Sequence, residues 1–100
     1  MNCDVVSKAT DKSAVIGVVG LGYVGLPLVR AFSQAGFKVI GFDIDAKKID
    51  MLLAGESYLR HIPASELAIE IRENRFVPTT DFTKLSECDA VLLCVPTPLN

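Results

Sequence analysis

The feature that most constrains the fold is a glycine-rich turn between a short β-branched run and a segment with helical periodicity. Residues 14–19 read AVIGVV, and residues 20–25 read GLGYVG directly after them. A continuous Val and Ile run without polar alternation predicts a strand that is buried on both faces. Beyond it, apolar or small side chains share one helical face: Leu21, Val24, Gly25, Leu28, Ala31, Phe32 and Ala35. A strand, a tight turn and a helix in this order begin a βαβ unit.

The next part of the chain predicts a second strand and a second helix. Residues 37–42 form an apolar run that follows Gly36, a residue suited to cap the first helix at its C-terminus. Asp45 is suited to be the N-cap of the second helix. Gly55 ends this helix, whose apolar stripe consists of Ile49, Leu52 and Leu53.

Residues 64–75 predict a third helix whose charged side chains lie on a solvated surface: Glu66, Glu70, Arg72 and Glu73. Residues 76–80 predict a weak strand, which Pro78 restricts to a sheet edge or a strand end. Residues 90–95 predict a further, continuously apolar strand. Because strands alternate with helices, we expect parallel pairing with right-handed crossovers. The predicted fold is α/β, a partial doubly wound parallel sheet of the Rossmann type with about four strands.

Composition and charge exclude several kinds of partner. The 100 residues carry 10 Lys and Arg against 12 Asp and Glu, a formal net charge of −2. Without clustered basic residues we expect no nucleic-acid partner and no anionic membrane surface. Residues 14–29 are uncharged, but they are fewer than the roughly 20 residues that a membrane span needs. Residues 1–12 lack the apolar region of a signal peptide and are expected to form a flexible lead-in.

The cysteines point to a reducing compartment. Cys3, Cys88 and Cys94 are an odd number and contain no C-x-x-C pair, so neither a disulfide framework nor a zinc site is expected. We therefore expect the cytoplasm. Cys94 lies inside the last predicted strand and is expected to be a buried small hydrophobe of little reactivity.

Each glycine of the turn has a mechanical role in a dinucleotide-binding motif. Gly20 allows the tight turn, Gly22 lets a pyrophosphate approach the backbone, and Gly25 lets the helix pack closely against the strand. The N–H groups at the start of the helix then face the phosphates. A glycine-rich turn that binds nothing is the alternative.

Asp43 stands where this motif requires an acidic residue. It follows Gly25 by 18 positions and ends the second predicted strand. Its carboxylate can accept hydrogen bonds from the adenosine ribose hydroxyls and would repel a 2′-phosphate, which favours NAD over NADP. Lys47 and Lys48 keep NADP as an alternative, because a nearby cation could tolerate that phosphate.

Three other features have open roles. Tyr23 could either shield the cofactor or pack on the helix. The rigid loop at residues 96–98 leaves the carboxyl end of a strand, where ligands bind in such sheets, and could be a cofactor wall or a proline-rich exit turn. For His61, the only histidine, we expect a structural or surface role rather than catalysis.

In five segments the sequence resembles the UDP-glucose/GDP-mannose dehydrogenase family, the nucleotide-sugar 6-dehydrogenases. The segments are residues 18–28 (VVGLGYVGLPL), 41–45 (GFDID), 55–58 (GESY), 79–82 (TTDF) and 95–99 (VPTPL), in the family's order. The string GLGYVGLP is far more specific than the general glycine pattern.

The resemblance implies a set of NAD-binding residues: Gly20, Gly22, Tyr23, Val24, Gly25, Asp43, Lys48, Val95, Pro96 and Thr97. It implies no catalytic residue and no metal ligand in this chain. The family's catalytic cysteine, lysine and asparagine belong to segments beyond it, and neither Cys88 nor Cys94 matches the cysteine's motif.

The resemblance also implies a reaction and a branch. The family oxidises the C6 alcohol of a nucleotide sugar to a carboxylate and reduces two NAD in succession. Pro96, where UDP-glucose and GDP-mannose enzymes usually have Gly or Asn, with Leu99 behind it, is closer to the UDP-N-acetylglucosamine 6-dehydrogenases. The run YLRHIP at residues 58–63 agrees. The implied substrate is UDP-N-acetylglucosamine or another UDP-N-acetylhexosamine.

Residues 13–100 are thus expected to be the N-terminal part of a Rossmann NAD-binding domain, truncated after its fourth strand. The parent enzyme would be a homo-oligomer of polysaccharide biosynthesis, and its missing C-terminal part would bind the UDP-sugar. Two alternatives are another β-hydroxyacid-type dehydrogenase, and a stand-alone or inactive NAD-binding fragment. An exposed edge and apolar face of the fourth strand would make the chain marginally stable or oligomeric.

Overall fold

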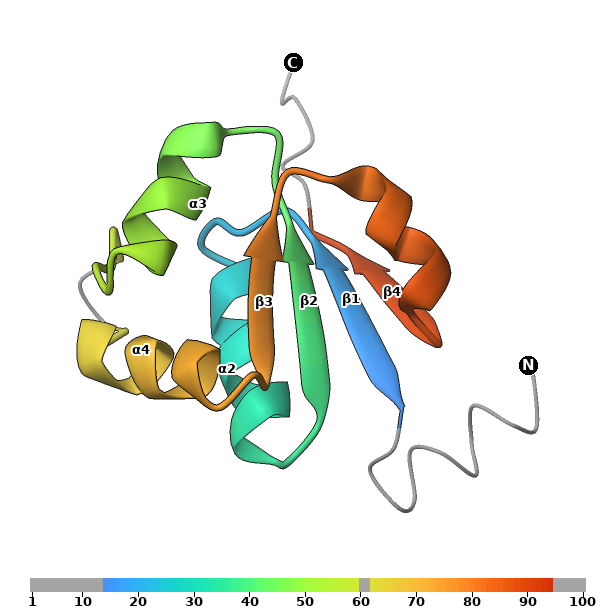
Figure 1. The fold of residues 1–100 in the computed structure, drawn as a ribbon, viewed down its shortest axis with the longest axis horizontal. Helices are drawn as coiled ribbons and strands as arrows, with labels where there is room; N and C mark the ends of the chain where they lie inside the picture. The colour runs from blue at the N-terminus through green and yellow to red at the C-terminus, as the bar shows by residue number, and fades with distance from the viewer. Residues whose placement is uncertain (1–13, 60–61, 95–100) are drawn as a thin grey trace.

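The computed structural model describes residues 14–59 and 62–94. Their elements follow one another in the order that the sequence predicts (Figure 1). In chain order these elements are β1 (Val15–Val19), α2 (Gly25–Gln34), β2 (Lys38–Phe42), α3 (Ala46–Leu53), α4 (Ala64–Arg72), β3 (Phe76–Thr79), the 3-10 helix η1 (Phe82–Glu87) and β4 (Ala90–Leu93).

The four described strands form one parallel sheet in the order β3-β2-β1-β4. Val19, at the end of β1, is in register with Phe42 on one side and with Leu93 on the other, so the carboxyl ends of these strands share one edge. The chain proceeds from β1 outward to β3 and then returns to the other side of β1. This reversal confirms the doubly wound fold and makes the carboxyl edge beside β1 the expected ligand site. Pro78 lies on the edge strand β3, as predicted.

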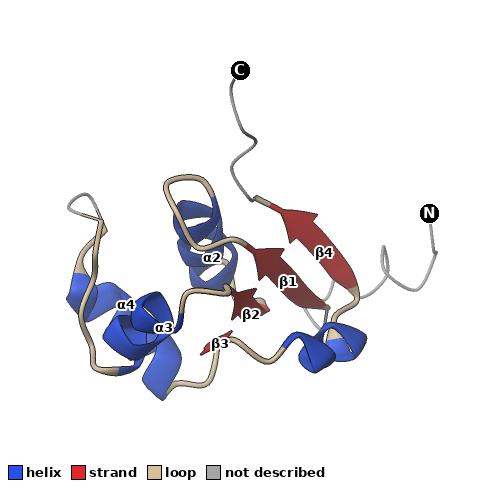
Figure 2. Ribbon diagram, turned by 90° about the horizontal axis from the view of Figure 1, so that it is seen from above, coloured by secondary structure: helices blue, strands red, loops and turns tan. Residues whose placement is uncertain are grey.

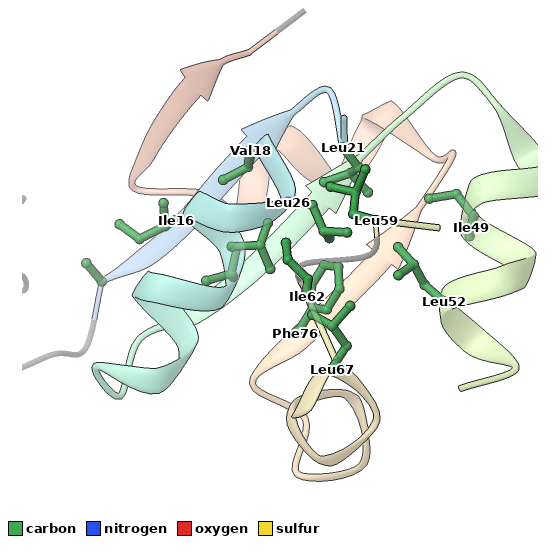
Figure 3. Packing of buried hydrophobic residues seen from close by; sticks show 13 residues of the cluster. Ile16, Val18, Leu21, Leu26, Ile49, Leu52, Leu59, Ile62, Leu67 and Phe76 are labelled. Atoms are coloured by element: carbon green, nitrogen blue, oxygen red, sulfur yellow. The ribbon is translucent and has the colours of Figure 1, made fainter. Parts of the chain in front are cut away.

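The two faces of the sheet are covered unequally. Helices α2, α3 and α4 lie on one face, whereas η1 alone lies on the other within the described part of the chain (Figure 2). The main core lies under the three helices (Figure 3). It consists of Ile16, Val18, Val39 and Phe76 from the strands, Leu26, Val29, Ile49, Leu52 and Leu67 from the helices, and Ala14, Leu21, Leu59 and Ile62 from the connections.

The buried face of α2 differs from the predicted one. Its buried residues are Gly25, Leu26, Val29 and Ser33, while Val24, Ala31 and Ala35 are exposed. The prediction counted the helical period from Leu21, but Leu21 belongs to the turn and the helix begins only at Gly25. The predicted face is therefore out of phase with the observed one.

The two helix-ending glycines and the predicted N-cap are confirmed. Gly36 and Gly55 follow the C-cap residues of α2 and α3. The Asp45 side chain accepts a hydrogen bond from the N–H of Lys47 at 3.0 Å. This bond satisfies one of the free amides in the first turn of α3.

Glu70 corrects the expectation of a solvated charged face on α4. Its side chain is buried, and its Oε2 lies 2.5 Å from Nε of Arg75, the residue that precedes β3. Glu66, from the same helix, pairs with Arg30 of α2 at 2.8 Å. Both carboxylates join α4 to its neighbours, but only the Glu70 carboxylate is buried, where a charge needs a partner because water is excluded.

Strand β4 is less buried than its continuous apolar sequence predicts. Val91 and Leu93 keep 42% and 75% of their surface exposed, since η1 does not extend over them. Cys94, expected inside the strand, follows its last residue and is half-buried. A continuously apolar sequence is typical of a strand that is covered on both faces. In the described part of the chain, β4 is covered on one face only.

Several sequence expectations fall outside the described residues. These are the lead-in at 1–12, His61, and the loop residues Val95, Pro96 and Thr97. Among the described residues, none of the helices is both long enough and apolar enough to cross a membrane.

Candidate nucleotide site

An open cavity of about 950 Å³ lies at the carboxyl edge of the sheet, where the strand order reverses. Residues from the turn after β1, the end of β2, the start of α3, the start of η1 and the end of β4 surround it. They are Val19, Gly20, Leu21, Gly22, Tyr23, Val24, Phe42, Asp43, Ile44, Asp45, Lys48, Phe82, Leu93 and Cys94.

The glycine turn has the geometry that its motif predicts. Gly20 has a φ of 98°, in the left-handed region that favours glycine. A Cβ on Gly25 would lie 1.6 Å from the carbonyl oxygen of Gly20, so the helix can approach the turn only without a side chain there. Nothing lies within 4 Å of the position of a Cβ on Gly22. The turn is therefore closed at Gly25 and open at Gly22, on the cavity side.

The start of α2 offers a backbone amide to a ligand. Its N-cap residue, Val24, has no side chain able to accept a hydrogen bond, in contrast to Asp45 at the start of α3. The N–H of Leu26 already donates to the carbonyl of Gly22 at 3.1 Å and Pro27 has no N–H, so Gly25 is the first helical residue whose N–H is left for an anion. Because Gly22 leaves open space near this amide, a phosphate group fits this end of the cavity.

Asp43 directly follows β2, and its side chain contacts the turn. The residue is only 9% exposed; Oδ2 accepts a hydrogen bond from the N–H of Leu21 at 2.9 Å, and Oδ1 accepts one from the N–H of Asp45 at 2.9 Å. The ammonium of Lys48 lies 3.9 Å from Oδ2. Since each carboxylate oxygen has a further lone pair, Asp43 can still accept hydroxyl groups from a ligand in the cavity.

Tyr58 is a functional candidate to which sequence reasoning assigned no role. Its hydroxyl donates a short hydrogen bond to the carbonyl oxygen of Leu21, and its ring centre lies 5.7 Å from Nζ of Lys48. Burial, followed by the charges of Asp43 and Asp45, raises the pKa of this phenol. The signals in the sequence were two segments of the family resemblance that contain Tyr58, GESY at 55–58 and YLRHIP at 58–63.

The structure brings most of the predicted residues together. Gly20, Gly22, Tyr23, Val24, Asp43 and Lys48 all line the cavity, and Gly25 lies buried below it. Tyr23 is 81% exposed, so its ring does not pack on the helix. The apolar lining of Ile44, Phe82 and Leu93 was not predicted, because a strand or helix period does not show which apolar residues face a cavity.

Comparison with known proteins supports the same interpretation of the site. Residues 14–100 match the model of the UDP-glucose/GDP-mannose dehydrogenase family, NAD binding domain. The chain is 37% identical over 86 residues to UDP-N-acetyl-D-glucosamine 6-dehydrogenase of Salmonella typhi, covering 85% of this chain and 19% of the relative. It is 40% identical over 90 residues to UDP-N-acetyl-D-mannosamine dehydrogenase of Escherichia coli K12, covering 87% of this chain and 20% of the relative.

A solved structure agrees with these relatives. The GDP-mannose dehydrogenase of Pseudomonas aeruginosa, in a ternary complex, superposes with a TM-score of 0.79 and 34% identity, covering 85% of this chain and 20% of that one. The chain thus spans about a fifth of the length of the proteins it matches. The glycine turn, the acidic end of β2 and the family match agree: this chain belongs to the UDP-glucose/GDP-mannose dehydrogenase family and corresponds to its NAD-binding domain.

Proposed function

We propose that this chain is the NAD-binding portion of an oxidoreductase that converts the C6 alcohol of a UDP-sugar to the uronate with two NAD. One observation carries the proposal: the Asp43 carboxylate and the open side of the glycine turn face the same cavity and are joined by a hydrogen bond of 2.9 Å. A ribose acceptor and a phosphate cradle are thus held at a fixed separation, as one dinucleotide requires.

We assign the cofactor contacts to the residues of this cavity. The pyrophosphate would lie over Gly22 and the first amide of α2, that of Gly25, with Tyr23 and Val24 beside it. Asp43 and Lys48 would hold the adenosine ribose through its hydroxyl groups. When bound, NAD accepts the hydride that leaves the substrate carbon, and this chain's residues hold and orient it.

Three further residues complete the proposed site from outside the described part of the chain. Val95, Pro96 and Thr97 follow β4 in sequence after one residue, Cys94. The carboxyl end of β4 faces the cavity through Leu93 and Cys94, so the loop that leaves it would form the next wall. This assignment rests on the VPTPL motif and on the position of β4.

A UDP-N-acetylhexosamine is the proposed substrate. The two relatives that are 37% and 40% identical carry the names of UDP-N-acetyl-D-glucosamine and UDP-N-acetyl-D-mannosamine dehydrogenases. A UDP-glucose 6-dehydrogenase from Haloferax volcanii is 30% identical. We propose that the remaining four-fifths of such a protein supply the sugar site, the catalytic residues and the contacts of a homo-oligomer. From the same similarity to these relatives we propose that the protein acts in the cytoplasm, in polysaccharide biosynthesis.

Calorimetric titration with NAD and NADP tests the cofactor site. We expect NAD to bind at least about tenfold more tightly than NADP, because a carboxylate repels a 2′-phosphate. Asp43→Asn keeps an acceptor oxygen but removes the charge, so it should reduce the ratio of the affinities for NAD and NADP. Asp81→Asn is the matched control, since Asp81 accepts the N–H of Thr83 at the start of η1 and does not line the cavity. A folded chain that binds neither nucleotide would overturn the proposal.

A further inference from the structure

Two neighbouring peptide groups of the glycine turn are fixed from outside the turn. Asp43 accepts the N–H of Leu21, which fixes the Gly20–Leu21 peptide. Tyr58 donates its hydroxyl proton to the C=O of Leu21, which fixes the Leu21–Gly22 peptide. The Leu21 side chain is fully buried between them, so the residue cannot leave this arrangement without opening the core.

The second bond determines where an amide of Gly22 points. A trans peptide is planar, and its C=O and N–H point in opposite directions. The hydrogen bond from Tyr58 to the Leu21 carbonyl therefore directs the Gly22 N–H away from Tyr58. Without that bond, glycine at position 22 leaves the peptide free to rotate, because no side chain restrains its backbone.

Tyr58 is itself held in place by the connection between α3 and α4. The Ser57 hydroxyl donates to the carbonyl of Leu59 at 3.0 Å, which closes a tight local bend around Tyr58. Leu59 and Ile62 are buried in the main core (Figure 3). Packing of the neighbouring residues thus holds the Tyr58 hydroxyl against the glycine turn before any ligand binds.

The ring of Tyr58 also touches the cationic side of the site. Nζ of Lys48 lies 5.7 Å from the ring centre and 3.9 Å from Oδ2 of Asp43. A cation at this distance from an aromatic face is attracted to it. One side chain thus contacts both the phosphate-binding turn and the cation beside the ribose-binding carboxylate.

We propose that Tyr58 is a positioning residue for the dinucleotide: its hydroxyl locks the Leu21–Gly22 peptide so that the Gly22 N–H is presented to the pyrophosphate. This inference rests on the proposed function. The raised pKa of the phenol, caused first by burial, supports it because the hydroxyl stays protonated and able to donate.

Tyr58→Phe tests the inference, because it removes the hydroxyl and keeps the ring beside Lys48. Ser33→Ala is the matched control, since it removes a buried hydroxyl that donates to the carbonyl of Arg30 at 3.2 Å within α2, away from the cavity. Affinities for NAD and for adenosine are measured by calorimetry on the full chain. Tyr58→Phe should weaken the affinity for NAD about tenfold, because the Gly22 N–H would lose its hydrogen bond to the pyrophosphate. The affinity for adenosine, which has no phosphate, should be nearly unchanged. Ser33→Ala should change neither affinity.

Amide NMR of the ligand-free protein gives a second readout that does not depend on binding. Gly22 should give one sharp resonance in the unaltered chain and in Ser33→Ala, and a broadened or split resonance in Tyr58→Phe. Equal NAD affinities of the unaltered chain and Tyr58→Phe overturn the inference alone, as does a Gly22 resonance already split in the unaltered chain. Failure of the folded, unaltered chain to bind NAD overturns the proposed function, and the inference with it.

Discussion

The N–H of Leu21 donates to the carboxylate of Asp43 at 2.9 Å, so the end of β2 fixes the turn that follows β1. Asp43 thus has a structural task beside the ribose contact proposed for it. Its two oxygens satisfy the backbone amides of Leu21 and Asp45. A binding residue that also supports the fold cannot be removed without changing both properties.

Asp43→Ala is therefore expected to lower stability as well as affinity. Leaving the buried Leu21 N–H without an acceptor should cost about 2 kcal/mol of unfolding free energy. Asp43→Asn keeps one acceptor oxygen, but its NH2 group would face the other of the two backbone N–H groups, so this variant should also lower stability. Urea unfolding followed by circular dichroism measures both. An Asp43→Ala chain as stable as the unaltered one would contradict the structural role.

Alanine substitutions at Gly25 and Gly22 should have opposite effects on stability. Gly25→Ala sets a methyl group 1.6 Å from the Gly20 carbonyl oxygen, so we expect a loss of about 3 kcal/mol or more, or no folded protein. Gly22→Ala meets nothing within 4 Å and should leave stability unchanged or raised by up to about 1 kcal/mol.

Gly22→Ala should nevertheless weaken NAD at least about tenfold, because the methyl group fills the space proposed for the pyrophosphate. Thermal unfolding and calorimetric titration on the same samples separate the two effects. If Gly22→Ala binds NAD as tightly as the unaltered chain, the pyrophosphate does not lie over this residue.

Local sequence signals predicted the fold and the cavity residues on the turn and at the end of β2. The run at 14–19, the glycine turn and Asp43 each act through backbone geometry within a few residues. Their spatial arrangement then follows from parallel pairing, since the carboxyl ends of the strands must meet. The helix-capping Asp45 and the edge position of Pro78 were predictable for the same reason.

What could not be predicted depends on contacts that no helical or strand period reports. Tyr58 lies 37 positions from the carbonyl it contacts, and the buried Glu70 pairs with Arg75, which lies beyond the end of α4. Periodicity within one helix cannot report either partner. The buried face of α2 was assigned wrongly because the period was counted from Leu21, whereas the helix begins only at Gly25.

Tyr58 should make stability depend on alkaline pH. Burial, then the charges of Asp43 and Asp45, raise its pKa above the ordinary value of 10.0. The folded state holds this proton more tightly than the unfolded chain does. The stabilisation is therefore fully present below pH 10.0 and is lost as the pH rises above it.

Tyr58→Phe removes the titrating group, so its unfolding free energy should fall less steeply than that of the unaltered chain above this pH. Ser33→Ala should keep the steep fall, since it loses a hydroxyl bond but not the phenol. Urea unfolding at a series of pH values from neutral to alkaline measures the slopes. Parallel slopes for Tyr58→Phe and the unaltered chain would exclude this linkage.

The exposed face of β4 should make the chain self-associate. Val91 and Leu93 lie on the sheet face that η1 leaves open, and β4 is an edge strand of the described sheet. An apolar face beside an unpaired strand edge is prone to pair with a second copy. Sedimentation velocity should therefore give a weight-average coefficient that rises with concentration.

The double variant Val91→Thr, Leu93→Lys should suppress this rise, because a charge on that face must be desolvated when two copies meet. Its unfolding free energy should stay within about 0.5 kcal/mol of the unaltered value, since both side chains are already exposed. Leu53→Lys is the matched control: Leu53 is exposed on α3, away from β4, and its replacement should leave the association as it was. If Leu53→Lys abolished the association and the double variant did not, the two copies would meet through the helix-covered face and not through β4. A chain that stays monomeric at every concentration would show that the open face of β4 does not bind a second copy.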